Sequence, residues 1–330
     1  MKALRKLLWP FSPLYAAAVY LRNVCYDRGW CRSVAFETPV LCVGNLSVGG
    51  SGKTPMVEWL LEFYRGRREV AVLSRGYRRR SKGFLQARPD STAAELGDEP
   101  LQLARKFPQA IVAVDADRVR GITRLLETAA PELIILDDGF QHRRVRPRYN
   151  LLLTAWEALY PDQGYLPAGD LRDHKSQARR ADLIIVTKCP EDPGPEERAR
   201  ILGKLKPLPH QQVVFATLAY DLPRDAHGQA VSWESLGPAP LTLVTGIARP
   251  QPLLDFLFQK GISFTHQRFP DHHRFTRAEI DAFNRSGRVL TTEKDAVRLE
   301  GRVANCYVLG VRHHFGPADR AMLEAFLESV

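Results

Sequence analysis

Short apolar runs alternate with longer amphipathic segments over the first two thirds of the chain. Near-continuous apolar runs of four to eight residues are typical of strands that are buried on both faces of a parallel sheet. Helix-length segments separate these runs, as connections between parallel strands require. We therefore predict an α/β fold with a doubly wound, mainly parallel sheet. Its strands are expected within residues 39–46, 69–77, 109–118, 133–136, 150–155 and 181–188.

The last third of the chain shows a second, shorter alternation. Two β-rich runs flank a turn that contains Pro223 and Gly228, which predicts a β-hairpin linker over residues 213–238. Further strand and helix patterns follow, and they end in a closing helix over residues 318–329. We predict that the parts of the chain are residues 1–212, the linker 213–238, and a second, smaller α/β domain over 239–330.

The first thirty residues form a segment of their own kind. Lys2, Arg5 and Lys6 precede an apolar and aromatic run over residues 7–21, which two prolines interrupt. The run is shorter than the ~20 residues of a spanning helix and lacks the cleavage site of a signal peptide. We predict a basic amphipathic segment, over about residues 1–30, that lies on an anionic membrane surface. The alternative is a helix packed on the protein's own core.

Charge narrows the class of partner. The 47 basic and 37 acidic residues give a net charge of +10, which favours nucleic acid, an anionic lipid surface or a phosphorylated substrate. The Arg/Lys clusters lack the interleaved aromatic residues of a single-strand binding platform, and each is equally compatible with a solvated face. The five cysteines show no C-x-x-C spacing, so neither a disulfide framework nor a zinc site is indicated.

The segment GNLSVGGSGKTP, residues 44–55, predicts a phosphate-binding loop between a buried strand and an amphipathic helix. Backbone N–H groups of such a loop surround phosphate oxygens, while Lys53 reaches the β- and γ-phosphates and the Thr54 hydroxyl ligates Mg²⁺. Ser47 stands where the usual pattern has its first glycine. We interpret this as a variant turn in which Gly49 and Gly50 supply the flexibility.

Two further patterns refine the nucleotide site. The strand at 133–136 delivers Asp137 and Asp138 at its carboxyl end, where a carboxylate holds Mg²⁺ directly or through water. Either residue fits the role of direct ligand. In a guanine-specific protein, the segment VTKCP at 186–190 would carry an aspartate two residues after Lys188, but Pro190 stands there. ATP is therefore the expected nucleotide, within a P-loop NTPase fold.

Eight segments, in order along nearly the whole chain, resemble the tetraacyldisaccharide 4′-kinases, the lipid A 4′-kinases of Gram-negative bacteria. The segments are GNLSVGGSGKTP, SRGY, LGDEPL, VDADRVRG, ILDDGFQH, LPAGDLRD, FPDHHRFT and TTEKDAV. The resemblance implies transfer of the ATP γ-phosphoryl group to the 4′-hydroxyl of an acylated glucosamine disaccharide 1-phosphate, which gives the 1,4′-bisphosphate, lipid IVA. It also implies a peripheral enzyme on the cytoplasmic face of the bacterial inner membrane, with no nucleic acid and no obligate protein partner.

The resemblance also implies roles for individual residues. Asp98 would accept the proton of the attacking hydroxyl, and His272 would pair with Asp98 and tune it. His273 stands next to His272, so the choice between the two histidines stays open, and Asp98 also fits a helix N-cap. Catalysis is assigned to Asp98, His272 and Lys53; phosphate binding to Asn45, Ser47, Gly49, Gly50, Ser51, Gly52, Lys53 and Thr54; metal binding to Thr54, Asp137, Asp138 and Glu99; and acceptor binding to Arg75, Arg118, Arg120, Gln141, His142 and Arg172.

Two other classes of protein share parts of this pattern. A nucleic-acid-dependent ATPase would have the same loop and positive charge, but nucleic acid would stimulate its ATP turnover. A P-loop metal-insertion chaperone would have the same fold, but it would carry clustered Cys and His ligands. The scattered cysteines disfavour the second class, and a phosphorylation assay with the lipid acceptor separates the kinase from both.

Overall fold

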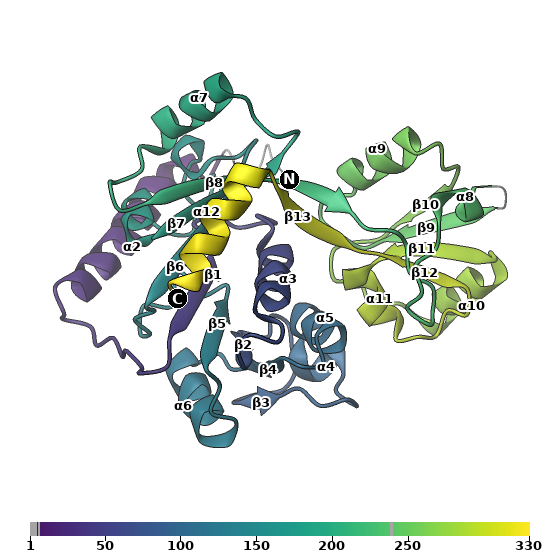
Figure 1. Cartoon of the computed structure of the whole chain (residues 1–330), viewed down its shortest axis with the longest axis horizontal. Coiled ribbons are helices and arrows are strands. Elements are labelled where there is room, and N and C mark those ends of the chain that lie inside the picture. The colour runs from purple at the N-terminus through teal and green to yellow at the C-terminus, as the bar shows by residue number, and fades with distance from the viewer. Residues whose placement is uncertain (1–4, 6, 238–239) are drawn as a thin grey trace.

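Two β-sheets and their covering helices make up the protein (Figure 1). The computed structural model describes residue 5, residues 7–237 and residues 240–330. The strands of the large sheet are β1 Val40–Gly44, β2 Val70–Ser74, β3 Leu85–Gln86, β4 Ile111–Val114, β5 Leu133–Asp137, β6 Tyr149–Ala155, β7 Leu183–Cys189, β8 Gln212–Tyr220 and β13 Val311–Phe315. Their order is β13-β8-β7-β6-β1-β5-β2-β4-β3. Only the edge strands β13 and β3 run antiparallel to their neighbours, which confirms the predicted α/β class with a mainly parallel sheet.

The small sheet has four parallel strands in the order β10-β9-β11-β12. They are β9 Leu241–Thr245, β10 Thr265–Arg268, β11 Arg288–Thr292 and β12 Cys306–Leu309, connected by α9 Gln251–Gln259, α10 Arg277–Arg285 and α11 Glu293–Leu299. In Figure 1 this sheet and its helices form the smaller lobe beside the large sheet.

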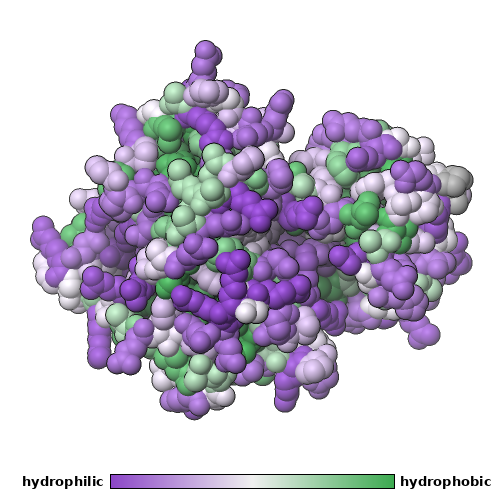
Figure 2. Space-filling model, viewed as in Figure 1, coloured by the Kyte–Doolittle hydropathy of each residue, from purple (hydrophilic) through white to green (hydrophobic). Residues whose placement is uncertain are grey.

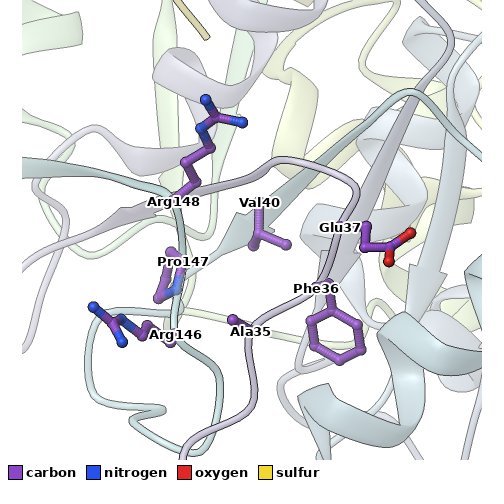
Figure 3. Close-up of a pocket in the computed structure, with 7 residues that line it drawn as sticks. All are labelled: Ala35, Phe36, Glu37, Val40, Arg146, Pro147 and Arg148. Atoms are coloured by element: carbon purple, nitrogen blue, oxygen red, sulfur yellow. The ribbon is translucent and has the colours of Figure 1, made fainter.

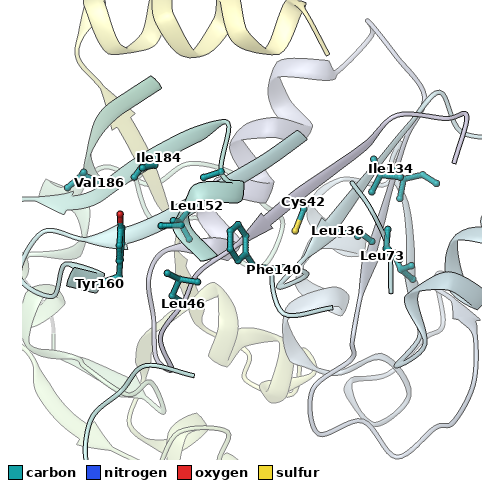
Figure 4. Close-up of a cluster of buried hydrophobic side chains, with 14 of the residues drawn as sticks. Cys42, Leu46, Leu73, Ile134, Leu136, Phe140, Leu152, Tyr160, Ile184 and Val186 are labelled. Atoms are coloured by element: carbon teal, nitrogen blue, oxygen red, sulfur yellow. The ribbon is translucent and has the colours of Figure 1, made fainter. Parts of the chain in front are cut away.

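Helices cover both faces of the large sheet. They are α3 Lys53–Tyr64, α4 Ala93–Leu96, α5 Asp98–Lys106, α6 Arg118–Thr128, α7 Pro195–Leu205 and α12 Pro317–Glu328. Successive β1 side chains point to opposite faces, so Cys42 joins one buried cluster (Figure 4) and Leu41 joins the other. The first cluster receives Ile122 from α6, and the second receives Met56 from α3. Burial on both faces explains why these strands read as continuous apolar runs.

The prediction of a β-hairpin linker over residues 213–238 is wrong, because its two halves do not pair with each other as strands. Residues 212–220 form β8, which pairs with β7 and, antiparallel, with β13. A tight turn does follow, because the Asp225 N–H donates to the Gln229 carbonyl. Residues 233–236, however, form the short helix α8 Trp233–Leu236 rather than a second strand. The apolar residues of β8 gain more burial inside the large sheet than an isolated two-stranded hairpin provides.

The end of the chain returns to the large sheet. Strand β13 pairs with β8, and Leu323 and Leu327 of α12 are fully buried in the same cluster as α3. Assigning residues 311–330 to the small domain was therefore wrong for the last strand and helix. Their sequence pattern shows an apolar face but not which sheet that face covers. A single residue, Gly310, separates β12 of the small sheet from β13 of the large sheet.

A charged cluster joins the helix of the phosphate loop to the small sheet. Lys106 Nζ of α5 lies 2.8 Å from the Glu58 carboxylate of α3 and 2.6 Å from that of Glu293 of α11. The Gln102 amide donates to Glu58 at 2.7 Å. Burial, and then the negative charge of Glu293, raise the pKa of Glu58 to about 7. Two carboxylates thus share one ammonium group where the two sheets meet.

The N-terminal segment contains the short 3₁₀ helix η1 Trp9–Phe11 and the helix α2 Ser12–Asp27. Polar contacts attach α2 to the rest of the protein, since the Asn23 amide donates to Asp173 at 2.7 Å and the Tyr15 hydroxyl donates to the Arg172 carbonyl at 3.1 Å. One face of α2 is half-buried against the protein, whereas the other face and the residues before the helix carry exposed apolar side chains. The large exposed ones are Leu7, Leu8, Trp9, Phe11, Leu14, Tyr20 and Leu21.

Part of α2 thus packs on the protein, as the alternative expects, while the exposed apolar side chains remain available to a membrane surface. Within the described residues, no helix is long and apolar enough to cross a membrane. Arg5 is not free to face lipid, because its guanidinium pairs with Asp170 at 2.9 Å, while Lys2 and Lys6 lie outside the described residues. Figure 2 shows that hydrophobic side chains are scattered over the face in view rather than gathered in one patch.

Candidate functional site

The phosphate loop and the paired carboxylates meet at one edge of the large sheet. Strands β1 and β5 are parallel neighbours, and Val43 lies opposite Asp137 in their register. The carboxyl ends of parallel strands reach the same edge, where ligands of α/β proteins bind. The loop after β1 and the carboxylates at the end of β5 are therefore side by side.

The loop has the backbone of a phosphate cradle. Gly49 and Gly52 adopt φ values of 105° and 84°, in the left-handed region that favours glycine. Gly50 does not, so the expected flexibility comes from Gly49 and Gly52 rather than from Gly49 and Gly50. Ser47 forms an antiparallel bridge with Leu171, which holds the start of the loop against the segment that carries Arg172.

Asn45, Lys53, Asp138 and Arg172 form one polar network. Lys53 Nζ lies 3.4 Å from Asn45 Oδ1 and 3.6 Å from Asp138 Oδ1. Arg172 Nη1 donates to Asp138 at 3.0 Å, and its Nη2 donates to Asn45 at 2.7 Å. Burial alone would raise the pKa of Asp138, but Lys53 and Arg172 outweigh it and lower that pKa to about 2. Asp138 is thus ionised and already paired with two cations.

Asp137 is in the opposite electrostatic situation. Its side chain is fully buried, and Ser74 Oγ donates to Oδ2 at 3.0 Å. The other oxygen, Oδ1, has no hydrogen-bond partner among the described residues. Burial, followed by the charges of Glu99 and Asp138, raises the pKa of Asp137 to about 7. An oxygen that lacks a hydrogen-bond partner and is surrounded by negative charge is a favourable ligand for a cation. Asp137 is therefore a better candidate than Asp138 for a direct metal ligand.

No cluster of three or more His, Cys, Asp or Glu side chains arranged as a metal cage occurs in the part of the chain that the structure describes. This does not conflict with a magnesium site of the phosphate-loop kind. Such a site takes one or two carboxylates, a hydroxyl and the phosphates of the nucleotide, rather than a cage built from protein alone.

Asp98 and His272 meet across the gap between the two sheets. Asp98 is the first residue of α5, and His272 lies in the loop between β10 and α10. His272 Nδ1 and Asp98 Oδ2 are 2.7 Å apart, and Arg298 Nε is 3.6 Å from the same oxygen. Burial alone would raise the pKa of Asp98, but the hydrogen bond with His272 and the charge of Arg298 hold it below its usual value. Gly97, not Asp98, occupies the N-cap of α5.

The adjacent histidine has a different partner. His273 Nε2 lies 3.0 Å from Glu279, which belongs to the capping box of α10, and the His273 ring stacks on Phe269. Of the two histidines, only His272 contacts Asp98. A φ of 62° at His272 turns consecutive side chains in different directions, and no residue-type pattern reveals that choice.

Several residues near this pair were missed by sequence reasoning. Lys294 Nζ lies 3.1 Å from Asp271, 3.4 Å from His272 Nε2 and 3.7 Å from Glu99. Lys294 belongs to the quoted segment TTEKDAV, and Arg298 follows one helical turn later, so an i, i+4 search along that helix would have found both.

Apart from Arg172, which pairs with Asp138, the expected acceptor contacts fall into three groups. Arg75 is exposed near Arg118, and Arg118 is buried, with Nη1 donating to the Asp115 carbonyl at 3.2 Å and Nε unpartnered among the described residues. Arg120 forms two hydrogen bonds with the Asp115 carboxylate, at 2.7 and 2.8 Å, so its guanidinium is engaged.

Gln141 and His142 lie behind the loop. The Gln141 amide donates to the Asn45 carbonyl at 2.8 Å. Burial, and then the charge of Arg118, lower the pKa of His142 to about 4, so this imidazole is neutral at physiological pH. Gln141 therefore supports the loop, whereas His142 lies near Arg118 as a neutral group rather than as a cation.

Two supports of the phosphate loop have no signal in the sequence. His313 of β13 lies 2.9 Å from the Gly52 carbonyl, and Thr187 of β7 donates to the Ser51 carbonyl at 2.8 Å. A Cβ on Gly52 would lie 2.8 Å from the His313 ring. Two features therefore require glycine at position 52: its left-handed φ and the closeness of the His313 ring.

The cavity in Figure 3 is remote from this edge. It measures about 350 Å³ and is lined by Phe36, Val40, Arg146 and Arg148 together with three neighbours. Val40 begins β1, and the phosphate loop follows the other end of that strand. The candidate site is an open edge of the sheet beside the small lobe, and not this cavity.

Comparison with known proteins identifies one family. Residues 4–330 match the family described as tetraacyldisaccharide-1-P 4′-kinase. A tetraacyldisaccharide 4′-kinase of Flavobacterium johnsoniae is 41% identical over 321 residues, covering 96% of this chain and 94% of the relative. The enzyme of that name from Parabacteroides distasonis is 45% identical over 309 residues, covering 89% and 84%. The crystal structure of LpxK from Aquifex aeolicus in complex with ATP superposes with a TM-score of 0.79 at 30% identity, covering 98% of both chains.

Proposed function

The chain belongs to the tetraacyldisaccharide-1-P 4′-kinase family, and we propose how its own residues carry out the reaction. The protein is a kinase that transfers the γ-phosphoryl group of ATP to the 4′-hydroxyl of a tetraacyldisaccharide 1-phosphate in lipid A biosynthesis. One observation supports the assignment of residues: the phosphate loop, the β5 carboxylates and the Asp98–His272 pair lie together at one site. The charge of Glu99, next to Asp98, acts directly on the pKa of Asp137.

Lys53 and the loop amides bind the β- and γ-phosphates. The Lys53 ammonium lies beside Asp138, which orients it toward the loop. Phosphoryl transfer requires positioning and charge neutralisation more than covalent chemistry. The acceptor oxygen bonds to the γ-phosphorus while the bond from that phosphorus to the β–γ bridging oxygen breaks, so ADP leaves.

Asp98 takes the proton of the acceptor hydroxyl. Its lowered pKa keeps it ionised at neutral pH, as a base must be. His272 holds the carboxylate from the small-lobe side, so the base is fully oriented only when the two sheets are close together. Such an arrangement limits ATP hydrolysis in the absence of the acceptor.

Mg²⁺ fits the donors at the end of β5. Asp137 offers its unpartnered oxygen, Thr54 offers its hydroxyl, and Glu99 adds negative charge nearby. Bound there, the ion neutralises phosphate charge. Asp138, held by Lys53 and Arg172, positions those two cations.

The acceptor is a lipid, and the N-terminal segment suits a membrane surface. Trp9, Phe11 and Leu14 are 69%, 58% and 69% exposed, which places apolar side chains where a bilayer could take them up. We place the enzyme as a peripheral protein at the cytoplasmic face of the bacterial inner membrane. Arg118 interacts electrostatically with Asp137 and Asp138, and Arg75 lies near Arg118. Neither arginine forms an ion pair among the described residues, and both are assigned to the acceptor phosphate.

The test is a phosphorylation assay in mixed micelles with a tetraacyl disaccharide 1-phosphate, ATP and Mg²⁺. We expect a 1,4′-bisphosphate from the wild type and a loss of at least about a hundredfold in Lys53→Ala. Lys204→Ala, a surface lysine paired with Asp162, is the matched control and should be unaffected. Formation of no bisphosphate by the wild type would refute the acceptor, and retention of more than about a tenth of the rate in Lys53→Ala would refute the role of the loop.

A further inference from the structure

Lys188 lies at the nucleotide edge of the large sheet and has no role in the mechanism above. It is the penultimate residue of β7, and its neighbour Thr187 donates to the Ser51 carbonyl of the phosphate loop at 2.8 Å. The pairing of β7 with β8 is shifted between Val186 and Cys189. This β-bulge re-aims the side chain of Lys188, as bulges near functional sites do.

The backbone of Lys188 is unusual for a lysine. Its φ is 58°, in the left-handed region that glycine adopts without strain. A side chain held in that conformation is unfavourable, and such outliers are concentrated at functional sites. Glycine would satisfy the fold at this position at lower cost. The lysine side chain therefore requires a separate explanation.

The ammonium group points at the phosphate loop. Lys188 Nζ lies 3.8 Å from the position that a Cβ on Gly50 would occupy. Among the described residues, no carboxylate pairs with this ammonium and no acceptor bonds to it within hydrogen-bond distance. Burial lowers its pKa, and so do the positive charges of Arg249 and Lys53, while the charge of Glu157, which forms no ion pair with it, acts in the opposite direction. A half-buried cation without an ion-pair partner, with two further cations nearby, gains stability when an anion binds beside it.

The order of strands indicates which part of the nucleotide this cation reaches. The carboxylates of β5 and the base Asp98 mark the end of the site where the γ-phosphate reacts, on one side of β1. Strand β7 lies on the other side of β1, with only β6 between them. A cation from β7 thus meets the triphosphate from the side remote from the transferred group.

We propose that Lys188 is a second phosphate-binding lysine of the ATP site, which contacts the α- and β-phosphates beside Gly50. Arg249 approaches the same anion from the loop after β9, so nucleotide phosphate screens the repulsion between a cation of the small lobe and one of the large sheet. This inference rests on the proposed binding of ATP at the loop. It assigns to Lys188 an affinity for ADP as well as for ATP, because both nucleotides carry the α- and β-phosphates.

The experiment is calorimetric titration of the full-length protein with Mg-ADP and Mg-ATP. Lys188→Gly removes the cation and the backbone strain together, and Lys188→Asn is a second variant with a residue that tolerates positive φ. Each should weaken binding of both nucleotides by about tenfold or more, the usual effect of losing a hydrogen bond to a charged group. Lys188→Arg should restore most of the affinity, and the Tm of unliganded Lys188→Gly should equal or exceed that of the wild type.

The matched control is Lys206→Gly. Lys206 is also a lysine at positive φ, 47°, but it caps the C-terminus of α7. This variant relieves the same kind of strain and should leave nucleotide affinity unchanged. In the phosphorylation assay, Lys188→Gly should raise the KM for ATP more than it lowers kcat, because the lysine contacts phosphates that are not transferred.

The outcomes separate this inference from the proposed function. If the wild type binds neither nucleotide, the assignment of the loop fails and this inference fails with it. If Lys53→Ala loses affinity for ATP while both Lys188 variants bind like the wild type, only the role of Lys188 is refuted. Normal nucleotide affinity with a raised KM for the lipid acceptor would also overturn it, since the anion would then be the acceptor's phosphate.

Discussion

The pairing of Asp98 with His272 predicts how two substitutions combine. Asp98→Ala removes the proposed base, which should lower kcat by about 10²- to 10⁴-fold, or about 3 to 5 kcal/mol. His272→Ala removes one 2.7 Å hydrogen bond to a charged acceptor, a loss of about 1.5–3 kcal/mol, or roughly 10- to 150-fold. Arg298, 3.6 Å from the same oxygen, keeps Asp98 ionised in that variant. The His272 effect should therefore be the smaller one.

The double variant is the decisive measurement. His272 acts through Asp98, so adding His272→Ala to Asp98→Ala should change kcat little, which gives a coupling energy close to the whole effect of His272. The assay is kcat at saturating ATP and acceptor. His272→Asn should recover part of the loss, because asparagine tolerates the φ of 62° and keeps a donor.

His273→Ala is the matched control. Its imidazole pairs with Glu279 and not with Asp98, so kcat should stay within about threefold of the wild type, a change of under ~1 kcal/mol. Losses that multiply in the double variant would show that His272 acts separately from Asp98, for example on the acceptor. A defect in His273→Ala with a silent His272→Ala would show that the wrong imidazole is assigned.

Two other features lead to predictions. Burial and the charge of Glu293 raise the pKa of Glu58 to about 7 in the folded protein. Between pH ~5 and 7, the folded protein therefore keeps a proton on Glu58 that the unfolded chain has lost. The free energy of unfolding should therefore fall as pH rises through this window, by about 2 kcal/mol in urea titrations, and Glu58→Gln should flatten the decline; an equal decline in the variant would contradict this. The double variant Trp9→Ser with Phe11→Ser should lower partitioning to phosphatidylglycerol vesicles by at least about tenfold. Phe258→Ser changes an equally exposed residue of α9 and should not lower it. Equal partitioning of the wild type and both variants would show that the N-terminal segment does not bind the membrane.

The sequence by itself determined the class of fold and the nucleotide end of the site. Strands buried on both faces must be apolar throughout, so β1, β5 and β7 stand out as runs of Val, Leu and Ile. The phosphate loop is local as well, because its glycines, Lys53 and the start of α3 follow one another in the chain. Short-range patterns of this kind carry their own geometry.

Tertiary structure decided what long-range packing controls. The apolar runs at 212–220 and 311–315 do not specify their partners, and burial in the large sheet rather than a local turn selected the pairing of β8 with β13. The same holds for His272 over His273, since one backbone angle aims the imidazole at Asp98, 174 positions away. Lys188 and His313 reach the phosphate loop only because β7 ends beside it and β13 runs past it. Contacts between residues far apart in sequence depend on how the sheets assemble, and no residue type encodes them alone.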